Sequence, residues 1–439
     1  MAPEDLVDGL VAKTQNAWPS ADFDLMAVNS LLSPMFQSGF YYKTFMGPSK
    51  GSWMFYEPFI RKAAGLGKAT DLPDPDRYDQ RFAFCDVLVI GGGIAGLEAA
   101  LVAARAGLRV MLLEQTAHWG GRAPVDGLQI DGKPAQDWID ATVAALAAMD
   151  TVTLRLRCTG AGVYDHGYVL ADERVADHTP GDGRPKHRLW RIRAGRIVTA
   201  TGAIERPLSF AGNDIPGVML ASAVRDYVVN QAVSPGDRTV VVTNNDDAYR
   251  TAIALKEAGL AVPCIVDARS TVAGPLADRA RALGIRIEAG RAIAKVKGGK
   301  RVTGVSLCLQ AGEGSVLEEI ACDAVAMSGG WSPVVHLWSH CGGKLTWDTA
   351  QVCFRPDPDR PPLTHDGSAM VIAAGSANGA LDDAAVLADA HAAGLAAVKA
   401  AGGKAKKSAA PVITDPIAYG VEPIWVMPQG AATKLRHKM

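Results

Sequence analysis

Cysteine and histidine patterns typical of metal sites are missing from this chain of 439 residues. Its seven cysteines are widely spaced and form no C-x-x-C pair, so zinc ribbons and iron–sulfur clusters have no support in the sequence. The nine histidines form no H-x-x-H or H-E-x-x-H pair, and the G-x-S-x-G spacing at residues 47–51 falls in an irregular segment and does not follow a predicted strand, as a nucleophile elbow would. We therefore predict no metal site, free thiols in a reducing compartment, and no catalytic residue that a motif could identify.

Excess charge and long hydrophobic runs are also missing. The formal net charge of −1 gives no overall basic field for a nucleic acid or an anionic membrane. No run of about 18 apolar residues could span a bilayer, and the acidic N-terminus lacks the apolar core of a signal peptide. Two basic clusters are predicted to be solvated: Lys404, Lys406 and Lys407, and Lys434, Arg436 and Lys438. The sequence thus predicts a cytoplasmic globular protein that has neither membrane nor nucleic acid as a partner.

Aromatic residues gather in residues 1–82, ahead of the rest of the chain. Glycine and proline interrupt this segment, which is too irregular for a domain of its own, and we predict an N-terminal arm. Burial of large rings would offset the cost of ordering the arm, against either the chain's own core or a neighbouring protein of a complex. Both alternatives stay open. The rings concerned belong to Trp18, Phe23, Phe36, Phe40, Tyr41, Tyr42, Phe45, Trp53, Phe55, Tyr56 and Phe59.

The pattern that follows the arm is that of a buried parallel sheet covered by helices. Residues 87–90 are a continuous apolar run, as expected of a strand that is covered on both faces. Residues 97–105 have helical periodicity and end just before Gly107. Further strands are predicted at residues 109–113 and 197–200.

A second unit repeats this order from Arg238. Asp267 follows Thr243 by 24 residues, as Glu114 follows Ile90 by 24 residues. This internal repeat predicts an α/β fold of two nested dinucleotide-binding, glutathione-reductase-like domains. The second unit has strands at 239–242 and 263–266 and a helix at 248–257, residues 324–330 and 369–375 look like strands returning to the first domain, and residues 384–400 look like a closing helix. The predicted boundaries are 1–82 for the arm, 83–210 with 326–400 for the first domain, 211–325 for the second, degenerate domain, and 401–439 for a polar tail.

The glycine-rich turn after residue 90 is the strongest functional signal. A lone G-x-G-x-x-G is weak, but here a strand precedes it, a helix follows, and an acid stands about 20 residues on. Gly91 permits the tight turn, Gly93 lets the backbone approach a pyrophosphate, and Gly96 lets the helix lie close to the strand. The helix N-terminus would face the phosphates of an ADP-containing cofactor, and Glu114 would accept hydrogen bonds from the adenosine ribose. The predicted contacts in this region are Gly91, Gly92, Gly93, Ile94, Ala95, Gly96, Glu114 and Gln115.

Two other segments bear on the same site. Gly120-Gly121-Arg122 could return over the phosphates, where Arg122 would pair with a phosphate oxygen, although an ordinary turn explains these residues equally well. The second unit has Thr243-Asn244-Asn245-Asp246-Asp247-Ala248 where the first has glycines. Its side chains would crowd the approach of a phosphate, and its two aspartates would repel one. We predict that this half no longer binds a nicotinamide cofactor.

Six further motifs carry a resemblance to a known family. They are Ser38-Gly39-Phe40-Tyr41-Tyr42-Lys43-Thr44-Phe45-Met46, Tyr56-Glu57-Pro58-Phe59-Ile60-Arg61, Ala64-Gly65-Leu66-Gly67, Tyr164-Asp165-His166, Thr201-Gly202-Ala203-Ile204-Glu205-Arg206-Pro207 and Gly375-Ser376-Ala377-Asn378-Gly379. Over nearly the whole chain, the sequence resembles the α subunit of bacterial heterotetrameric sarcosine oxidase. Opine and proline dehydrogenases, N-methylglutamate dehydrogenase and hydrogen cyanide synthase have a similar core.

The resemblance implies a subunit of a complex that oxidatively demethylates sarcosine or a similar N-methyl amine. In that family a β subunit holds FAD, an FMN at the α/β interface passes electrons to oxygen, small subunits complete the assembly, and the α subunit binds NAD. The implied NAD contacts are Gly91, Gly93, Gly96 and Glu114, with Thr201, Gly202, Ala203 and Gly375 lining the site and Gly121 and Arg122 beside it.

Departures from the family pattern leave alternatives open. The folate-binding domain and an additional N-terminal domain of the family are expected to be absent here, so that transfer of the one-carbon unit would fall to another polypeptide. No cysteine lies between Cys85 and Cys158, which excludes a redox disulfide in the first domain, so any redox chemistry must belong to a cofactor. FAD and NAD share their ADP half, and the chain could instead be a self-sufficient FAD-dependent oxidoreductase. A third alternative is a non-catalytic scaffold subunit that a cofactor stabilises.

Overall fold

The computed structural model describes residues 17–20, 22–31, 45, 47–65, 71, 73–74, 76–179 and 182–428. Most of the first family motif, residues 38–44 and 46, lies outside this part, as does the basic cluster near the C-terminus. The chain divides into one unit of residues 1–78 and 175–186 and a second unit of residues 79–174 and 187–439. Within the described part, no helix combines the length and apolarity that a membrane span requires. No three or more His, Cys, Asp or Glu side chains gather there as a metal site.

The described part of the arm is short and helical. It contains the 3-10 turns η1 (Leu25–Ser30) and η3 (Lys50–Ser52) and the helix α2 (Trp53–Ala63). No residue of α2 is buried, and the rings of Phe55 and Phe59, 5.9 Å apart, are 69% and 67% exposed. The two predicted alternatives, that the arm packs against the chain's own core or against a neighbouring protein, both stay predictions.

The first large sheet has the predicted buried strands at its centre. Its order is β5-β2-β1-β8-β7-β6, with β21 also paired to β8. Strands β1, β2 and β5 are parallel, and the last four residues of β1 are all buried. These strands are β1 (Tyr78–Ile90), β2 (Val110–Leu113), β5 (Val152–Arg155), β6 (Cys158–Tyr164), β7 (Tyr168–Arg174), β8 (His187–Thr199) and β21 (Val371–Ala373), with the turn η4 (Asp165–Gly167) between β6 and β7.

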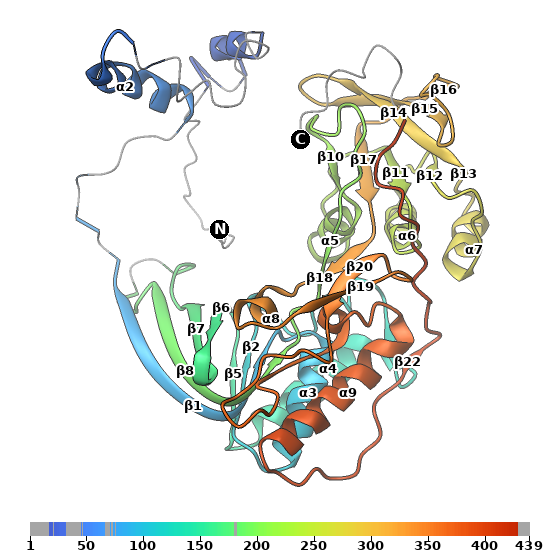
Figure 1. The fold of residues 1–439 in the computed structure, drawn as a ribbon. Coiled ribbons are helices and arrows are strands. Elements are labelled where there is room, and N and C mark those ends of the chain that lie inside the picture. Colours follow the sequence, from blue (N-terminus) through green and yellow to red (C-terminus); the bar gives the residue numbers. More distant parts are fainter. Residues whose placement is uncertain are drawn as a thin grey trace. The chain divides into compact units, whose positions relative to one another are not determined.

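Two alanine-rich helices pack closely against each other in this domain. The predicted helices are confirmed as α3 (Ile94–Arg105) and α9 (Asp383–Ala400), and α4 (Ala135–Ala147) lies beside α3 (Figure 1). Gly394 brings the helices together, because a Cβ atom there would come within 2.9 Å of the Val102 side chain. A buried hydrogen bond of 2.7 Å between His391 Nδ1 and Glu98 Oε1 also joins them.

The second sheet is entirely parallel and has the order β10-β17-β11-β12-β13. The prediction that residues 324–330 return to the first domain is wrong, because β17 pairs with β10 and β11 of the second sheet. An apolar run fits any buried parallel strand, and only tertiary structure selects its neighbours. The elements are β10 (Val218–Leu220), β11 (Thr239–Thr243), β12 (Ile265–Asp267), β13 (Ile287–Ala289) and β17 (Ala324–Ser328), with α5 (Ala221–Gln231), α6 (Ala248–Glu257) and α7 (Pro275–Ala282). An antiparallel sheet follows: β14 (Arg291–Gly298), β15 (Val302–Leu309) and β16 (Glu318–Ile320).

Short elements connect the two domains. β9 (Ala203–Glu205) pairs antiparallel with β18 (Trp331–Pro333), so that the chain leaves and re-enters the first domain through one ribbon. The other short elements are α8 (His336–His340), the hairpin β19 (Leu345–Asp348) and β20 (Cys353–Pro356), the turn η5 (Gly375–Asn378), and the three strands β3 (Gln129–Ile130), β4 (Lys133–Pro134) and β22 (Ile413–Thr414).

The last described segment is packed rather than detached. Ile413 and Met427 are 3% and 1% exposed, although both belong to the tail predicted from residue 401. Figure 1 shows this segment, in dark red, passing from α9 to the second domain. Polar composition therefore correctly predicted that residues 404–409 are exposed, but it did not predict that Ile413 and Met427 are buried.

Candidate functional site

The glycine-rich turn between β1 and α3 uses each glycine differently. A Cβ atom on Gly91, whose φ is +109°, would overlap the carbonyl oxygen of Ala200, and one on Gly96 would overlap the carbonyl oxygen of Gly91. A Cβ atom on Gly93 would meet nothing closer than the Cα atom of Gly121, at 3.9 Å. Gly91 and Gly96 therefore permit close chain packing, whereas Gly93 borders open space, as predicted for the glycine that a phosphate approaches.

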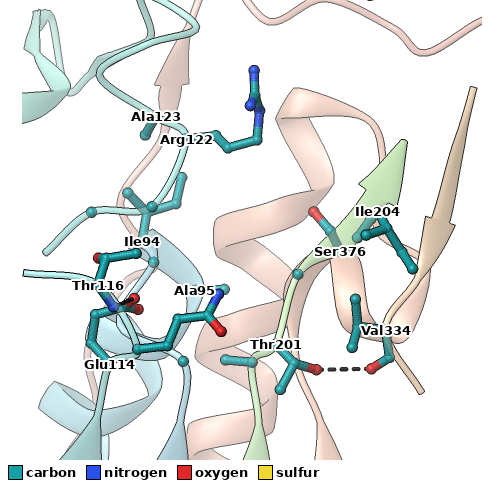
Figure 2. Close-up of a pocket in the computed structure, with 18 of the residues that line it drawn as sticks. Ile94, Ala95, Glu114, Thr116, Arg122, Ala123, Thr201, Ile204, Val334 and Ser376 are labelled. Carbon is teal, nitrogen blue, oxygen red and sulfur yellow. Dashed lines mark hydrogen bonds between the residues drawn. The ribbon is translucent and has the colours of Figure 1, made fainter. Parts of the chain in front are cut away.

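A cavity of about 870 Å³ opens beside this turn. Figure 2 shows Glu114 and Thr116 on one side of it, Ile204 and Val334 on the other, and Thr201 between them. The predicted residues that line the cavity are Gly91, Gly93, Ile94, Ala95, Glu114, Gln115, Gly121, Arg122, Thr201, Gly202 and Ala203. These residues come from the ends of β1, β2 and β8, the start of α3 and the segment that follows Gly120.

Three predicted residues lie behind the cavity wall instead. Gly92 donates its N–H to Glu114 Oε2 at 2.7 Å, and Gly96 packs α3 against the turn. Gly375, with φ +63°, lies against Ala95 and donates its N–H to Asp389 Oδ2 at 2.7 Å. Its neighbour Ser376 lines the cavity. These three glycines therefore shape the site and do not face into it.

Glu114 is held in place by backbone amides. Its carboxylate accepts the N–H of Gly92 and the N–H of Thr116, both at 2.7 Å, and its side chain is almost buried beside the cavity. A carboxylate has about four lone-pair sites, so two remain for a ligand. The end of β2 thus presents a fixed anionic acceptor one strand away from the glycine-rich turn.

The segment with Gly120, Gly121 and Arg122 does return to the glycine-rich turn. Gly120 donates its N–H to the Gly92 carbonyl at 2.8 Å, and Gly93 and Gly120 form a parallel bridge. Arg122 pairs with Asp126 at 3.0 Å, and its guanidinium lies over the Trp331 ring, 5.2 Å from the ring centre. Its Nε atom is buried and has no hydrogen-bond partner among the described residues. A cationic side chain with a spare donor therefore borders the cavity.

The far end of the cavity comes from residues that the sequence analysis did not predict. Trp331 on β18 and Tyr419 after β22 line it together, and Trp331 donates its backbone N–H to Tyr419 Oη at 2.8 Å. Asp247 and Asp383 complete this end, and Arg250 pairs with both. No local signal marks these residues as a group, because they come from four segments that only the fold brings together.

A buried ion network supports this end. Arg225 is 1% exposed and bonds to Asp126 at 2.9 Å and to Asp247 at 3.0 Å. The pKa of Asp247 is lowered: burial raises it, but the charges of Arg225, Arg122 and Arg250 outweigh burial. Asp247 therefore carries a negative charge that cations of both domains neutralise.

Glu205 gives a pH-dependent prediction. Burial raises the pKa of this carboxyl group, whose Oε2 atom accepts the Ser222 N–H at 2.8 Å. Because the pKa of Glu205 is higher in the folded protein than in the unfolded chain, the protonated carboxyl group favours the folded state. This contribution to stability is fully present below about pH 4.3, and it is lost as the pH rises through the folded-state pKa and the buried group must ionise. Glu205→Gln keeps the acceptor without the charge, so its melting temperature should exceed that of the wild type at about pH 8 and approach it at about pH 4. The exposed variant Glu313→Gln is the control; a Glu205→Gln gain that is largest at low pH would contradict the assignment.

Comparison with known proteins identifies the family. Residues 85–352 match the family model described as pyridine nucleotide-disulphide oxidoreductase. The chain belongs to this family. It is 44% identical over 353 residues to the sarcosine oxidase alpha subunit of Rhizobium meliloti (strain 1021), covering 80% of this chain and 35% of that protein. It is 39% identical to the alpha subunit of Corynebacterium sp. (strain P-1), with 83% and 37% covered, and 26% identical to an opine oxidase subunit of Rhizobium meliloti, with 63% and 56% covered.

The chain therefore spans little more than a third of the length of these sarcosine oxidase subunits. Solved structures of similar fold include L-proline dehydrogenase from P. horikoshii, with a TM-score of 0.54, 23% identity and coverage of 74% of this chain and 57% of that one. T. acidophilum thioredoxin reductase has a TM-score of 0.53 and 18% identity, with 72% and 97% covered. The predicted α/β dinucleotide-binding fold and the resemblance to sarcosine oxidase α subunits are confirmed.

Proposed function

We propose that this chain is the NAD-binding, α-type subunit of a sarcosine-oxidase-like flavoprotein complex. The observation that carries the proposal is the open place at the N-terminus of α3, between Gly93 and Gly121, with the Glu114 carboxylate one strand away. Backbone N–H groups and the helix dipole favour a diphosphate at such a place, and the carboxylate suits the ribose hydroxyls of its adenosine. When bound, NAD would supply nicotinamide chemistry.

The acidic end of β2 favours NAD over its phosphorylated form. Glu114 is fixed by two amides and cannot turn away from a ligand. A 2′-phosphate on the ribose would face this carboxylate, and a free 2′-hydroxyl would donate to it. Arg122, with its unpaired Nε donor, would meet a phosphate oxygen or the distal half of the cofactor.

The cavity offers no protein redox couple of its own. Cys158 is the one cysteine among the described residues that line it, and burial raises the pKa of its thiol far above the usual range. A neutral, buried thiol is unreactive. This observation supports placing amine oxidation on FAD in a β-type partner, with electrons passing through FMN at the interface to oxygen and small subunits completing the complex, as in the family that the chain resembles.

The test is to co-purify the chain with its untagged partners, release the bound nucleotide with acid and separate it by chromatography. We expect NAD from this chain and oxygen uptake that depends on sarcosine or a related N-methyl amine. Absence of NAD from the released nucleotides would overturn the proposal, whether or not FAD from the partner is recovered. A flavin spectrum from the chain on its own would favour the self-sufficient flavoenzyme, and nucleotide without any amine-dependent oxygen uptake would favour the scaffold.

Glu114→Gln should weaken NAD binding about tenfold, because a charge-assisted hydrogen bond contributes roughly 1.5–3 kcal/mol. The Gln side chain has one acceptor oxygen, so it can keep the hydrogen bond from only one of the two N–H groups, of Gly92 or Thr116, and offers a ribose hydroxyl a weaker, uncharged acceptor. Titration of the apo-complex with NAD measures the effect. Asp86→Asn, within β1 of the same sheet and outside the cavity lining, is the matched control and should leave NAD affinity unchanged. Equal affinity of wild type and Glu114→Gln would remove the carboxylate from the site.

A further inference from the structure

Residues 419–425 lie directly on the loop that takes the place of the glycine-rich turn in the second domain. Asp246 donates its N–H to the Gly420 carbonyl, and Glu422 donates its N–H to the Asn244 carbonyl, both at 3.0 Å. Val421 and Asn245 form an antiparallel bridge between these bonds. The backbone groups after β11 that would meet a dinucleotide phosphate in an intact site are therefore paired with the chain itself.

Side chains close the same contact. Asn244 is fully buried and donates its amide to the carbonyls of Glu422, at 2.7 Å, and Ile424, at 3.1 Å. Gly420 donates its N–H to Asp246 Oδ2 at 2.9 Å, and a Cβ atom on Gly420 would overlap that oxygen. The loop's polar residues, which lack a role in phosphate binding, thus have the last described segment as their partner.

The acid of the second unit is occupied as well. Asp267 corresponds to Glu114 by its spacing from the preceding strand, but it is fully buried. Its carboxylate accepts the Tyr249 hydroxyl at 2.8 Å and the Arg269 guanidinium at 2.8 and 3.0 Å. Arg269 also bonds to Asp246 at 2.8 Å and so joins the acid to the loop under Gly420. The Asp267 carboxylate is therefore committed to protein donors and turned away from any ribose.

We infer that residues 419–425 are a built-in occupant of the second dinucleotide site. The chain then holds a single dinucleotide, in the cavity of the first domain, and a soluble nicotinamide nucleotide has no second place from which to exchange hydride with it. The occupancy of the second site stands on the contacts above; the single dinucleotide in the first cavity rests on the proposed function. Tyr419, in the same segment, also lines the cavity of the first domain and accepts the Trp331 N–H there. The segment therefore contributes to the cavity of the first domain as well as covering the loop of the second.

Hydrogen–deuterium exchange and nucleotide counting on the co-purified complex test this inference. We expect the amides of Gly420 and Glu422 to be protected like those of β11, and one nicotinamide dinucleotide per chain, counted apart from the partner's flavins, even with saturating NADH or NADPH. In Gly420→Val, protection of Glu422 should fall by about tenfold or more. Gly299→Val is the matched control, since nothing lies within 4 Å of a Cβ atom at Gly299, and it should leave that protection unchanged.

Unprotected amides at Gly420 and Glu422 in the wild type would overturn the inference, as would a second equivalent of nicotinamide nucleotide per chain at saturation. Unchanged protection of Glu422 in Gly420→Val would also overturn it, because the valine side chain must then fit without displacing the segment. Protected amides with no recovered NAD would support occupancy of the second site and refute the proposed NAD site. The two failures are therefore distinguishable.

Discussion

Gly93→Glu should lower NAD affinity by at least about 100-fold, because a carboxylate close to the diphosphate costs several kcal/mol. The position faces open space, with Gly121 as the nearest neighbour, so the side chain has room to fold into the cavity. It would lie at the N-terminus of α3, where its charge competes with the phosphates for the same amides. Nucleotide release from the purified complex, and titration with NAD, measure the loss.

Two control variants, Gly93→Ala and Gly96→Ala, separate the loss of NAD affinity from damage to the fold. Gly93→Ala adds a methyl group where space exists and should retain most of the bound nucleotide. Gly96→Ala places a Cβ atom onto the Gly91 carbonyl and should destabilise the protein by about 1–3 kcal/mol. The predicted diphosphate site beside Gly93 would be wrong if Gly93→Glu kept its nucleotide. It would also be wrong if the variant lost the nucleotide only because it no longer folded, as shown by loss of its cooperative melting transition.

Arg225→Met should lower the free energy of unfolding by about 3–5 kcal/mol. Arg225 is 1% exposed, and its removal leaves Asp126 and Asp247 without their shared cation in a buried setting. The pKa of Asp247 should then rise, since burial already opposes its charged form. Because the wild-type pKa is lowered, the stability that this pair contributes is present above about pH 4 and is lost as pH falls through the folded pKa. The difference between wild type and variant should therefore narrow in acid.

Urea unfolding at several pH values measures this difference. Arg279→Met is the control, because Arg279 and its partner Glu257 are largely exposed, and such a surface pair is worth at most about 1 kcal/mol. Equal losses in the two variants would mean that the Arg225 network adds nothing beyond a surface ion pair.

The glycine-rich site was predictable because its parts are close in sequence. Strand β1, the turn and α3 follow each other directly, and Gly96 packs against Gly91 within the turn, although the carbonyl that Gly91 approaches belongs to the distant Ala200. The spacing to Glu114 is set by one helix and one strand, so counting residues placed the carboxylate at the end of β2. The segment at Gly120 also follows soon after, although its return to the turn was only one of two alternatives.

Local pattern and chain composition determined the α/β class, the repeated unit, the glycine-rich turn and the loss of glycines in the second half. Tertiary structure alone decided that β17 belongs to the second sheet, that Trp331, Tyr419 and Asp247 meet at one end of the cavity, and that residues 419–425 cover the second loop. Periodicity and turn residues report which backbone conformation a segment prefers. They carry no information on which distant segment satisfies its hydrogen bonds, and Asn244 and Ile424, for example, are 180 residues apart.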